Sequence, residues 1–198
     1  MTRRAWLPVL IIAGLGLTGC ASGTSSASKP ALSTAGAGES MAGMSMAPAG
    51  SAANSASKPT ATALMICGDD IKGKVTQVLK LGASPATRSS FANELYTCTY
   101  LLPMGPLVLS VQHSESKAAA GHYFDTLRTK LAPAETLDGL GEHAYGTSTG
   151  IAVVVKDNET LKVDATGLPS VFGADRQKRT DLAYEIASDV LGCWTGDE

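Results

Sequence analysis

Apolar residues recur at helical spacing in three segments of the chain. The first segment, 69–81, begins with two aspartates, Asp69 and Asp70, either of which can cap a helix. The second begins at Ser114 and continues to about residue 131, and the third covers about 174–192. Each segment presents one apolar stripe, so the pattern predicts three amphipathic helices. The stripes are Ile71, Val75, Val78 and Leu79; Phe124, Leu127 and Leu131; and Leu182, Ile186, Val190 and Cys193.

Four stretches around these helices have the composition of β-strands and are joined in pairs by turn residues. Strands are expected over 94–102 and 107–113, separated by a Pro-Met-Gly-Pro turn. A second pair covers 151–156 and 160–165, with Asp157-Asn158 as a two-residue hairpin turn. Hairpins followed by helices indicate an α+β fold, in which three helices pack on an antiparallel sheet in the order α-ββ-α-ββ(β)-α.

The first twenty residues have the character of an export signal. Arg3 and Arg4 precede an apolar stretch, 5–16, which is too short to span a bilayer because that requires about 20 apolar residues. Leu17-Thr18-Gly19-Cys20 follows directly and resembles the bacterial lipobox. The resemblance implies that residues 1–19 are a signal peptide and that Cys20 is acylated on its thiol at the mature N-terminus. The arginine pair is compatible with either Sec or twin-arginine export.

A low-complexity tether is expected over residues 20–62. Of the 42 residues in 21–62, 34 are Ala, Ser, Gly, Thr or Pro, a composition that buries too little apolar surface to offset the entropy of folding. The tether is therefore expected to be disordered. The composition becomes that of a globular protein afterwards, and a single α+β domain is expected over 63–198.

The net charge excludes a basic nucleic-acid-binding protein as the default interpretation. The chain has 16 basic and 18 acidic residues, a formal charge of −2. Loss of residues 1–19 removes two arginines and leaves a charge of −4, whereas binding to nucleic-acid phosphates requires a basic surface. The expected partner is instead the membrane, contacted through the lipid anchor at the extracytoplasmic face of the cell membrane.

Two short motifs match catalytic or cofactor loops but occur in the wrong structural context. Residues 146–150 match the G-x-S-x-G nucleophile elbow around Ser148, yet a strand follows where the elbow requires a helix. Gly139–Ala144 matches a dinucleotide-binding G-x-G-x-x-A loop, again without the helix. The three histidines lack the spacing of metal ligands. The sequence therefore predicts turns at both motifs, no catalytic residue, no cofactor and a protein that is not an enzyme.

Three cysteines remain once Cys20 is acylated, and one disulfide is expected in an oxidising compartment. Cys67 precedes the first predicted helix, Cys98 lies in the first strand, and Cys193 continues the apolar stripe of the last helix. A Cys67–Cys98 bridge leaves Cys193 as a buried thiol, whereas a Cys67–Cys193 bridge joins the two ends of the domain. We expect the Cys67–Cys98 bridge and keep Cys67–Cys193 as the alternative.

Several short segments are similar to a group of actinobacterial secreted cell-envelope lipoprotein domains that has no assigned activity. These segments are the cysteine at the first helix, Cys98-Thr99-Tyr100, and Gly139–Tyr145 before a pair of strands. The resemblance covers roughly 64–194. It implies a small α+β domain in the cell envelope, distantly similar to extracellular sensor domains of bacterial kinases, and it implies no catalytic residues.

The preferred hypothesis is a membrane-anchored lipoprotein whose domain is a non-enzymatic binding or sensor-like module. Its ligand would be another envelope protein, a wall component or a small molecule. One alternative is a copper-handling lipoprotein, because Met41, Met44 and Met46 offer soft thioether ligands for Cu(I) within six residues. The other is an envelope enzyme of unrecognised type, which a cleft containing a strongly perturbed titratable group would favour.

Overall fold

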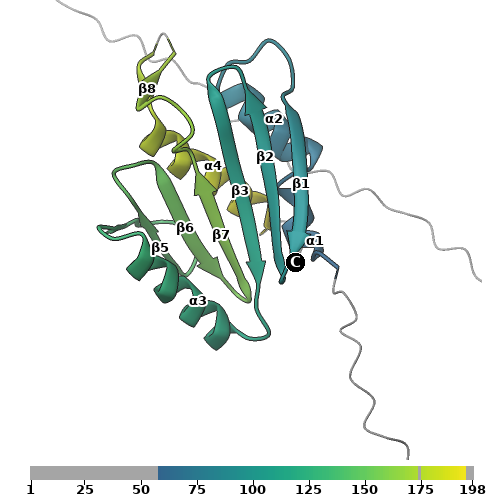
Figure 1. Ribbon diagram of the computed structural model, residues 1–198, viewed down its shortest axis with the longest axis vertical. Coiled ribbons are helices and arrows are strands. Elements are labelled where there is room, and N and C mark those ends of the chain that lie inside the picture. Colours follow the sequence, from purple (N-terminus) through teal and green to yellow (C-terminus); the bar gives the residue numbers. More distant parts are fainter. Residues whose placement is uncertain (1–57, 174, 195–198) are drawn as a thin grey trace, which may run out of the picture.

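The computed structural model describes residues 58–173 and 175–194. They form an α+β fold around one antiparallel sheet of seven strands in the order β1-β2-β3-β7-β6-β5-β4, with a separate hairpin of β8 and β9 (Figure 1). This confirms the predicted fold class. The strands are β1 Ala86–Ala92, β2 Leu95–Leu102, β3 Gly105–His113, β4 Glu135–Thr136, β5 His143–Gly146, β6 Ile151–Lys156, β7 Glu159–Asp164, β8 Val171–Phe172 and β9 Gln177–Lys178.

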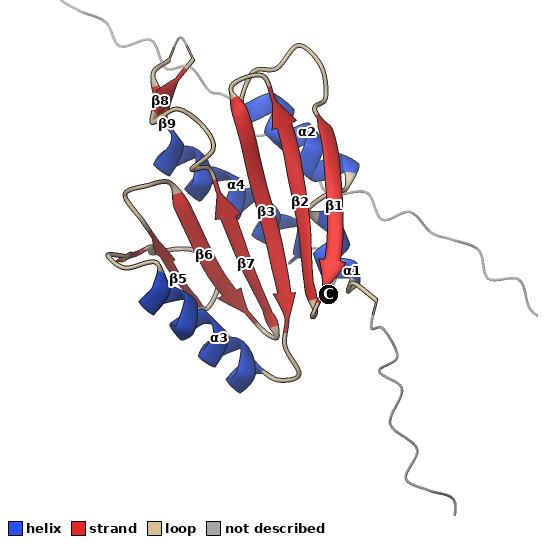
Figure 2. Ribbon diagram, viewed as in Figure 1, coloured by secondary structure: helices blue, strands red, loops and turns tan. Residues whose placement is uncertain are grey.

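Helices pack on both faces of this sheet, but unequally (Figure 2). One face packs against α1, α2 and α4 in the main hydrophobic core. On the opposite face, side chains of β5 and β6 pack against α3 in a smaller second core. As a consequence β6 is buried from both sides, which explains its unbroken apolar run. The helices are α1 Ala61–Met65, α2 Asp69–Val78, α3 Lys117–Lys130 and α4 Arg179–Trp194.

The predicted apolar stripes lie where the sequence pattern places them. On α4, all four stripe residues are buried. On α3 Phe124 is buried, while Leu127 and the C-cap residue Leu131 pack against the second core. Buried side chains alternate with more exposed ones along strand β2, and the buried ones pack in the main core. The turn Asp157-Asn158 is also confirmed, because Lys156 and Glu159 pair directly across it.

Strand β1 occupies a stretch for which the sequence pattern predicts no strand. Its side chains are exposed or half-buried along its whole length, and only Phe91 packs against the main core. Its sequence, with serine, threonine and arginine at four of the seven positions, lacks the regular alternation of apolar and polar residues by which a half-buried strand is predicted. The strand forms because its backbone pairs with β2 over seven residues, a tertiary contact that periodicity does not reveal.

The folded domain begins before the predicted boundary at residue 63. Helix α1 starts at Ala61, and the hydroxyl oxygen of Thr60 accepts a 3.0 Å hydrogen bond from the Ala63 backbone N–H. The same hydroxyl donates a 3.0 Å hydrogen bond to Glu159 Oε1 on β7. Because α1 continues the Ala/Thr composition of the preceding segment, its start depends on this cap and on packing against the domain.

Two helix starts differ in detail from the predicted caps. Gly68, not an aspartate, is the N-cap of α2, and both aspartates lie in its first turn, where negative charge favours the helix dipole. Helix α3 is capped by Ser116 rather than Ser114, and the Ser116 hydroxyl accepts a 3.2 Å hydrogen bond from the Ala119 N–H. The predicted stripes of both helices nevertheless pack against the two cores.

Helix α4 starts at Arg179, later than predicted, because the residues before it form the β8–β9 hairpin. It continues to Trp194, beyond the predicted end. Over the described ranges, no helix combines the length and the apolar character needed to cross a bilayer.

Candidate functional site

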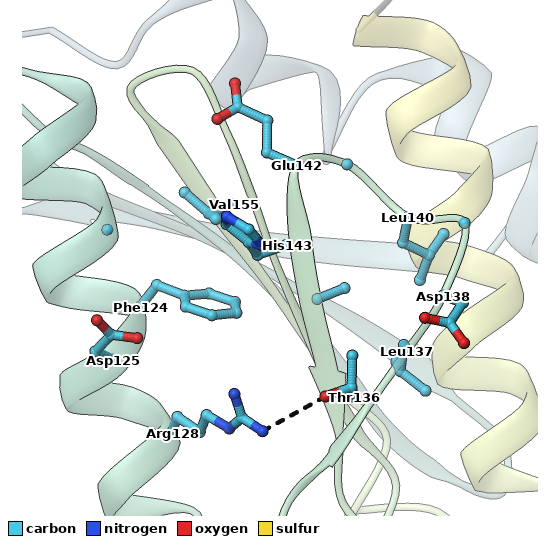
Figure 3. A pocket seen from close by; sticks show the side chains of 14 residues that line it. Phe124, Asp125, Arg128, Thr136, Leu137, Asp138, Leu140, Glu142, His143 and Val155 are labelled. Carbon is cyan, nitrogen blue, oxygen red and sulfur yellow. Dashed lines mark hydrogen bonds between the residues drawn. The ribbon is translucent and has the colours of Figure 1, made fainter.

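An open cleft of about 580 Å³ lies between α3 and the segment that leads from β4 to β5 (Figure 3). Helix α3 forms one wall and contributes Phe124, Asp125 and Arg128. Residues 136–144 form the opposite wall, and Val155 of β6 adds an apolar side chain between the two. The cleft therefore combines an apolar floor with charged side chains on its walls, which is the usual make-up of a site for a small ligand.

The wall opposite α3 has a tightly determined backbone. At Gly141 the φ angle is +54°, and a Cβ there would lie 2.5 Å from Val154 Cγ1 and 2.9 Å from the Val155 carbonyl oxygen. The next residue, Glu142, donates its backbone N–H to the same Val155 carbonyl at 3.0 Å. Leu140 is buried in the main core. The glycine pattern that matched a dinucleotide loop thus serves close packing of the wall against β6.

An ionic cluster fixes one end of this wall to α3 and to the β6–β7 turn. Lys117 Nζ lies 3.1 Å from Glu142 Oε1 and 2.7 Å from Asp157 Oδ1, and Lys156 Nζ lies 2.9 Å from Asp157 Oδ2. Hydrogen bonds from Lys117 and Lys156 lower the pKa of Asp157 to about 2. The pKa of Glu142 is also lowered, first by the Asp157 backbone N–H and then by Lys117. These charges are mutually compensated.

Arg128 has a different environment, since none of the described acidic side chains forms an ion pair with it. Its guanidinium carbon lies 5.9 Å from the centre of the Tyr145 ring, a cation–π arrangement. One guanidinium nitrogen lies 3.5 Å from Thr136 Oγ1 (Figure 3). Asp125 on α3 and Asp138 on the facing wall carry exposed carboxylates in the same cleft. The cleft can therefore receive a molecule with both an anionic and a cationic group.

The aromatic pair below Arg128 is structural. Phe124 and Tyr145 are both buried, and their ring centres lie 4.8 Å apart with an interplanar angle of 59°. Burial raises the pKa of Tyr145 well above its ordinary value, so the hydroxyl stays protonated at physiological pH. A protonated, buried phenol is poorly suited to act as a base, and the pair instead supports the guanidinium.

A second group of polar side chains joins the start of the domain to the sheet. Glu159 is only 8% exposed, and its Oε1 lies 3.0 Å from His113 Nδ1 and accepts the hydrogen bond from Thr60. Trp194, at the end of α4, borders the same region as Glu159, around a hollow of about 450 Å³. These contacts bring the first and last described elements to one end of β3 and β7, so we assign them a structural role.

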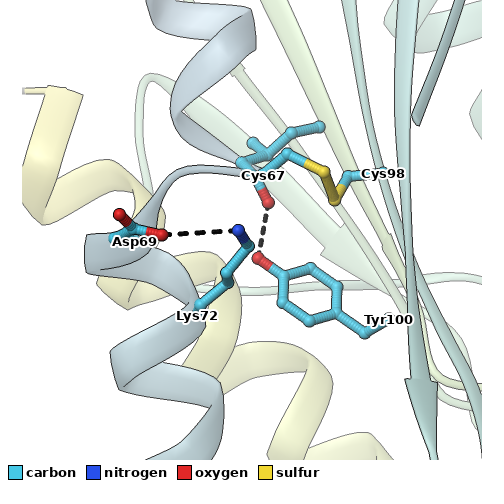
Figure 4. The surroundings of a disulfide bond; sticks show 6 residues. Cys67, Asp69, Lys72, Cys98 and Tyr100 are labelled. Carbon is cyan, nitrogen blue, oxygen red and sulfur yellow. Dashed lines mark hydrogen bonds and ion pairs between the residues drawn. A yellow bond between two sulfur atoms is a disulfide. The ribbon is translucent and has the colours of Figure 1, made fainter. Parts of the chain in front are cut away.

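Cys67 and Cys98 form a disulfide, as expected, between the turn after α1 and the middle of β2 (Figure 4). Beside it, the Tyr100 hydroxyl donates a 2.6 Å hydrogen bond to the Ile66 carbonyl oxygen. Cys193 is buried on α4 and takes no part in this disulfide. The bridge and the tyrosine together fix the α1–α2 turn to the sheet.

The two catalytic-loop matches that lie in the described residues form turns, as the sequence predicts. Ser148 is exposed in a turn that leads into β6, as predicted, and the 139–144 loop leads into β5 rather than into a helix. Within the described ranges, no group of three or more His, Cys, Asp or Glu side chains could hold a metal ion. Cys20 and the methionines Met41, Met44 and Met46 lie outside the described residues.

No family model, curated protein or solved structure matches this chain.

The sequence pattern does not reveal the charged residues of the cleft. Asp125, Arg128 and Asp138 belong to no motif, and two of them lie on α3 next to its apolar stripe. The available signal was the pair of glycines at 139 and 141, which predicted a tight turn but not the helix that faces it. Only the packing of α3 on β5 and β6 brings the two walls together.

Proposed function

We propose that this chain is a lipid-anchored, extracytoplasmic binding module that is not an enzyme, and that the cleft between α3 and residues 136–144 is its ligand site. The observation that carries the proposal is Arg128, a cation without an ion-pair partner among the described residues, between exposed carboxylates and above an apolar floor. This arrangement fits a small molecule with a carboxylate and an ammonium group. A short peptide of the cell wall has this chemistry and agrees with the expected location.

The anchoring part of the proposal rests on the sequence. Residues 1–19 have the layout of a signal peptide, Cys20 completes the Leu-Thr-Gly-Cys motif, and about 40 residues of tether composition separate it from the domain. As a flexible chain, such a tether has a root-mean-square span of roughly 35 Å. The domain would stay near the outer surface of the cell membrane while its cleft remains free to meet a ligand.

The ligand site can be tested by adding a muropeptide with free carboxylate and amino groups to the isotope-labelled domain. We expect its amide NMR signals to shift around Phe124, Arg128 and the 136–144 wall. Arg128→Ala should weaken binding by about tenfold, the effect of one charge-assisted hydrogen bond. Arg88→Ala is the matched control, because Arg88 is an exposed arginine on β1, at the other edge of the sheet. Equal binding by both variants would place the ligand elsewhere.

The anchor is tested separately by intact-mass spectrometry of the protein extracted from membranes. We expect the mature chain to begin at Cys20 and to carry the mass of a diacylglyceryl group. The Cys20→Ser variant should carry no lipid mass, because a hydroxyl is a much poorer nucleophile than a thiol. A membrane-bound wild-type protein with an unmodified Cys20 would contradict the proposed location.

A further inference from the structure

Strand β1 is one edge of the sheet, and its turn determines which of its backbone groups point outward. Ala92 and Leu95 pair directly across the two-residue turn 93–94, whose residues have φ angles of +52° and +60°. In such a hairpin the pair next to the turn exchanges two hydrogen bonds, and bonded and non-bonded pairs alternate from there. Three residues therefore direct both backbone N–H and C=O away from β2: Thr87, Ser89 and Phe91.

These outward groups are not protected in the ways that edge strands commonly are. Proteins cover or interrupt their edges with proline, lysine, bulges or very short strands. Strand β1 has seven residues in unbroken register with β2, contains no proline, and has Arg88 as its one charged residue. At the other edge, β4 has only two residues. Among the described strands of the main sheet, β1 is therefore the edge that can accept another strand.

We infer that β1 pairs in antiparallel orientation with β1 of a second copy of this chain, in the register centred on Ser89. All seven residues then pair, and the outward groups of Ser89 meet those of the other Ser89. Thr87 faces Phe91, an aromatic and β-branched pair of the kind that stabilises sheets, and Arg88 faces Ser90. The same strand serves both copies, as a two-fold symmetric interface requires.

The composition of β1 favours the register centred on Ser89 and favours β1 of a second copy as the pairing strand. A shift by two residues in one direction places Arg88 opposite Arg88 and keeps only residues 86–90 paired, and a shift in the other direction pairs only 88–92. Like charges directly opposite each other destabilise a sheet. The strand is thus complementary to itself in its longest register. The proposed ligand cleft lies beyond β5, at the other end of the sheet, so the pairing leaves both clefts open.

Sedimentation velocity of residues 21–198 tests the pairing. We expect a concentration-dependent equilibrium between monomer and dimer. Ser89→Pro removes an outward N–H but leaves the β1–β2 ladder intact, and it should weaken dimerisation by about tenfold or more. Ser89→Ala keeps the backbone edge and should dimerise like the wild type. Circular dichroism and melting establish that both variants are folded.

The register is tested by cross-linking, which does not depend on the proline variant. In a Cys193→Ala background, oxidation of a mixture of Arg88→Cys and Ser90→Cys chains should give a disulfide-linked dimer, because these residues face each other in the inferred register. The Thr136→Cys variant on β4 is the matched edge control and should give little. A wild-type chain that remains monomeric at every concentration, or cross-linking as efficient through Thr136→Cys, would overturn the inference.

Discussion

At the scale of single residues, the position of the cleft wall at 136–144 depends on one steric constraint, at Gly141, and on one set of surface charges, around Asp157. Gly141 is required by shape, because a side chain there would overlap Val154 and the Val155 carbonyl. Asp157 and Lys117, in contrast, hold the wall by charge on the protein surface. The first constraint is independent of pH, while the second is lost when the carboxylate is protonated. Substitutions can therefore separate the two.

Gly141→Ala should destabilise the domain more than Gly139→Ala. Both residues have positive φ, so each alanine costs about 1–2 kcal/mol of backbone strain. At position 139 the nearest atom to the new Cβ is 3.7 Å away, whereas at 141 the overlaps add about 1–3 kcal/mol. Urea unfolding of the two variants measures the difference in the free energy of unfolding. Equal losses would show that the wall moves easily.

Asp157→Asn should lower stability at neutral pH but not in acid. The pKa of Asp157 is about 2 in the folded protein, below the ordinary 3.8. The stabilisation by its ionised form is therefore complete above about pH 4 and is lost as pH falls towards 2. We expect the difference in unfolding free energy between wild type and variant to shrink across this window. Asparagine also tolerates the φ of +54° at this position.

The Lys117→Met background provides the control for the pH prediction. Lys117 donates the hydrogen bond that contributes most to the lowered pKa of Asp157. Without this lysine, Asp157→Asn should have a smaller effect at neutral pH, and a double-mutant cycle measures the coupling. An unchanged effect would assign the stabilisation to Lys156 or to the backbone of the turn.

At the scale of elements, the sequence predicts those that are buried and misses those that depend on neighbours. Strand β6 and the stripe of α4 consist of apolar residues at the right spacing, so their type follows from the pattern. Strand β1 and helix α1 bury little and continue the polar or alanine-rich composition around them. The cleft belongs to the second class, because its walls become neighbours only when α3 packs on the sheet.

The disulfide joins strand β2, which the sequence predicts, to the turn after helix α1, which it does not. It should contribute strongly to stability. It connects the turn after α1 to β2 across a sequence separation of 31 residues. In the chain-entropy model, a loop of this length contributes about 3–4 kcal/mol. The Cys67→Ala/Cys98→Ala variant should lose about this amount in urea unfolding. Cys193→Ala, the control at a buried cysteine outside the bridge, should lose about 1 kcal/mol.

Peptide mapping without reductant checks the pairing itself. We expect a peptide that contains Cys67 linked to Cys98, and a mass for the Cys193 peptide that is independent of reduction. A Cys67–Cys193 peptide would contradict both the sequence prediction and the structure. The mapping and the unfolding experiment are independent. If mapping finds the Cys67–Cys98 bridge but the Cys67→Ala/Cys98→Ala variant is as stable as the wild type, only the expected contribution of the bridge to stability would be wrong.

At the scale of the whole molecule, the domain is assembled from two halves of the chain. Strands β1–β3 come from the first half and β4–β7 from the second, and the halves meet where β3 pairs with β7. Helices from both halves share one core. Lys74 Nζ on α2 also lies 4.0 Å from Asp189 Oδ1 on α4. The hydrogen bond from Thr60 to Glu159 attaches the start of the domain to β7, where the two halves meet. The two halves should therefore unfold together.

This arrangement predicts that a chain starting at Lys58 is more stable than one starting at Ala63. The shorter chain lacks Thr60, which caps α1 and donates a hydrogen bond to the buried Glu159. Loss of the cap and of this hydrogen bond should cost about 1–3 kcal/mol. Thr60→Val in the longer chain removes both interactions without shortening it and should reproduce most of the loss, whereas Thr60→Ser should retain them. Equal stability of the two chains in urea unfolding would place the start of the domain at residue 63, as the composition predicts.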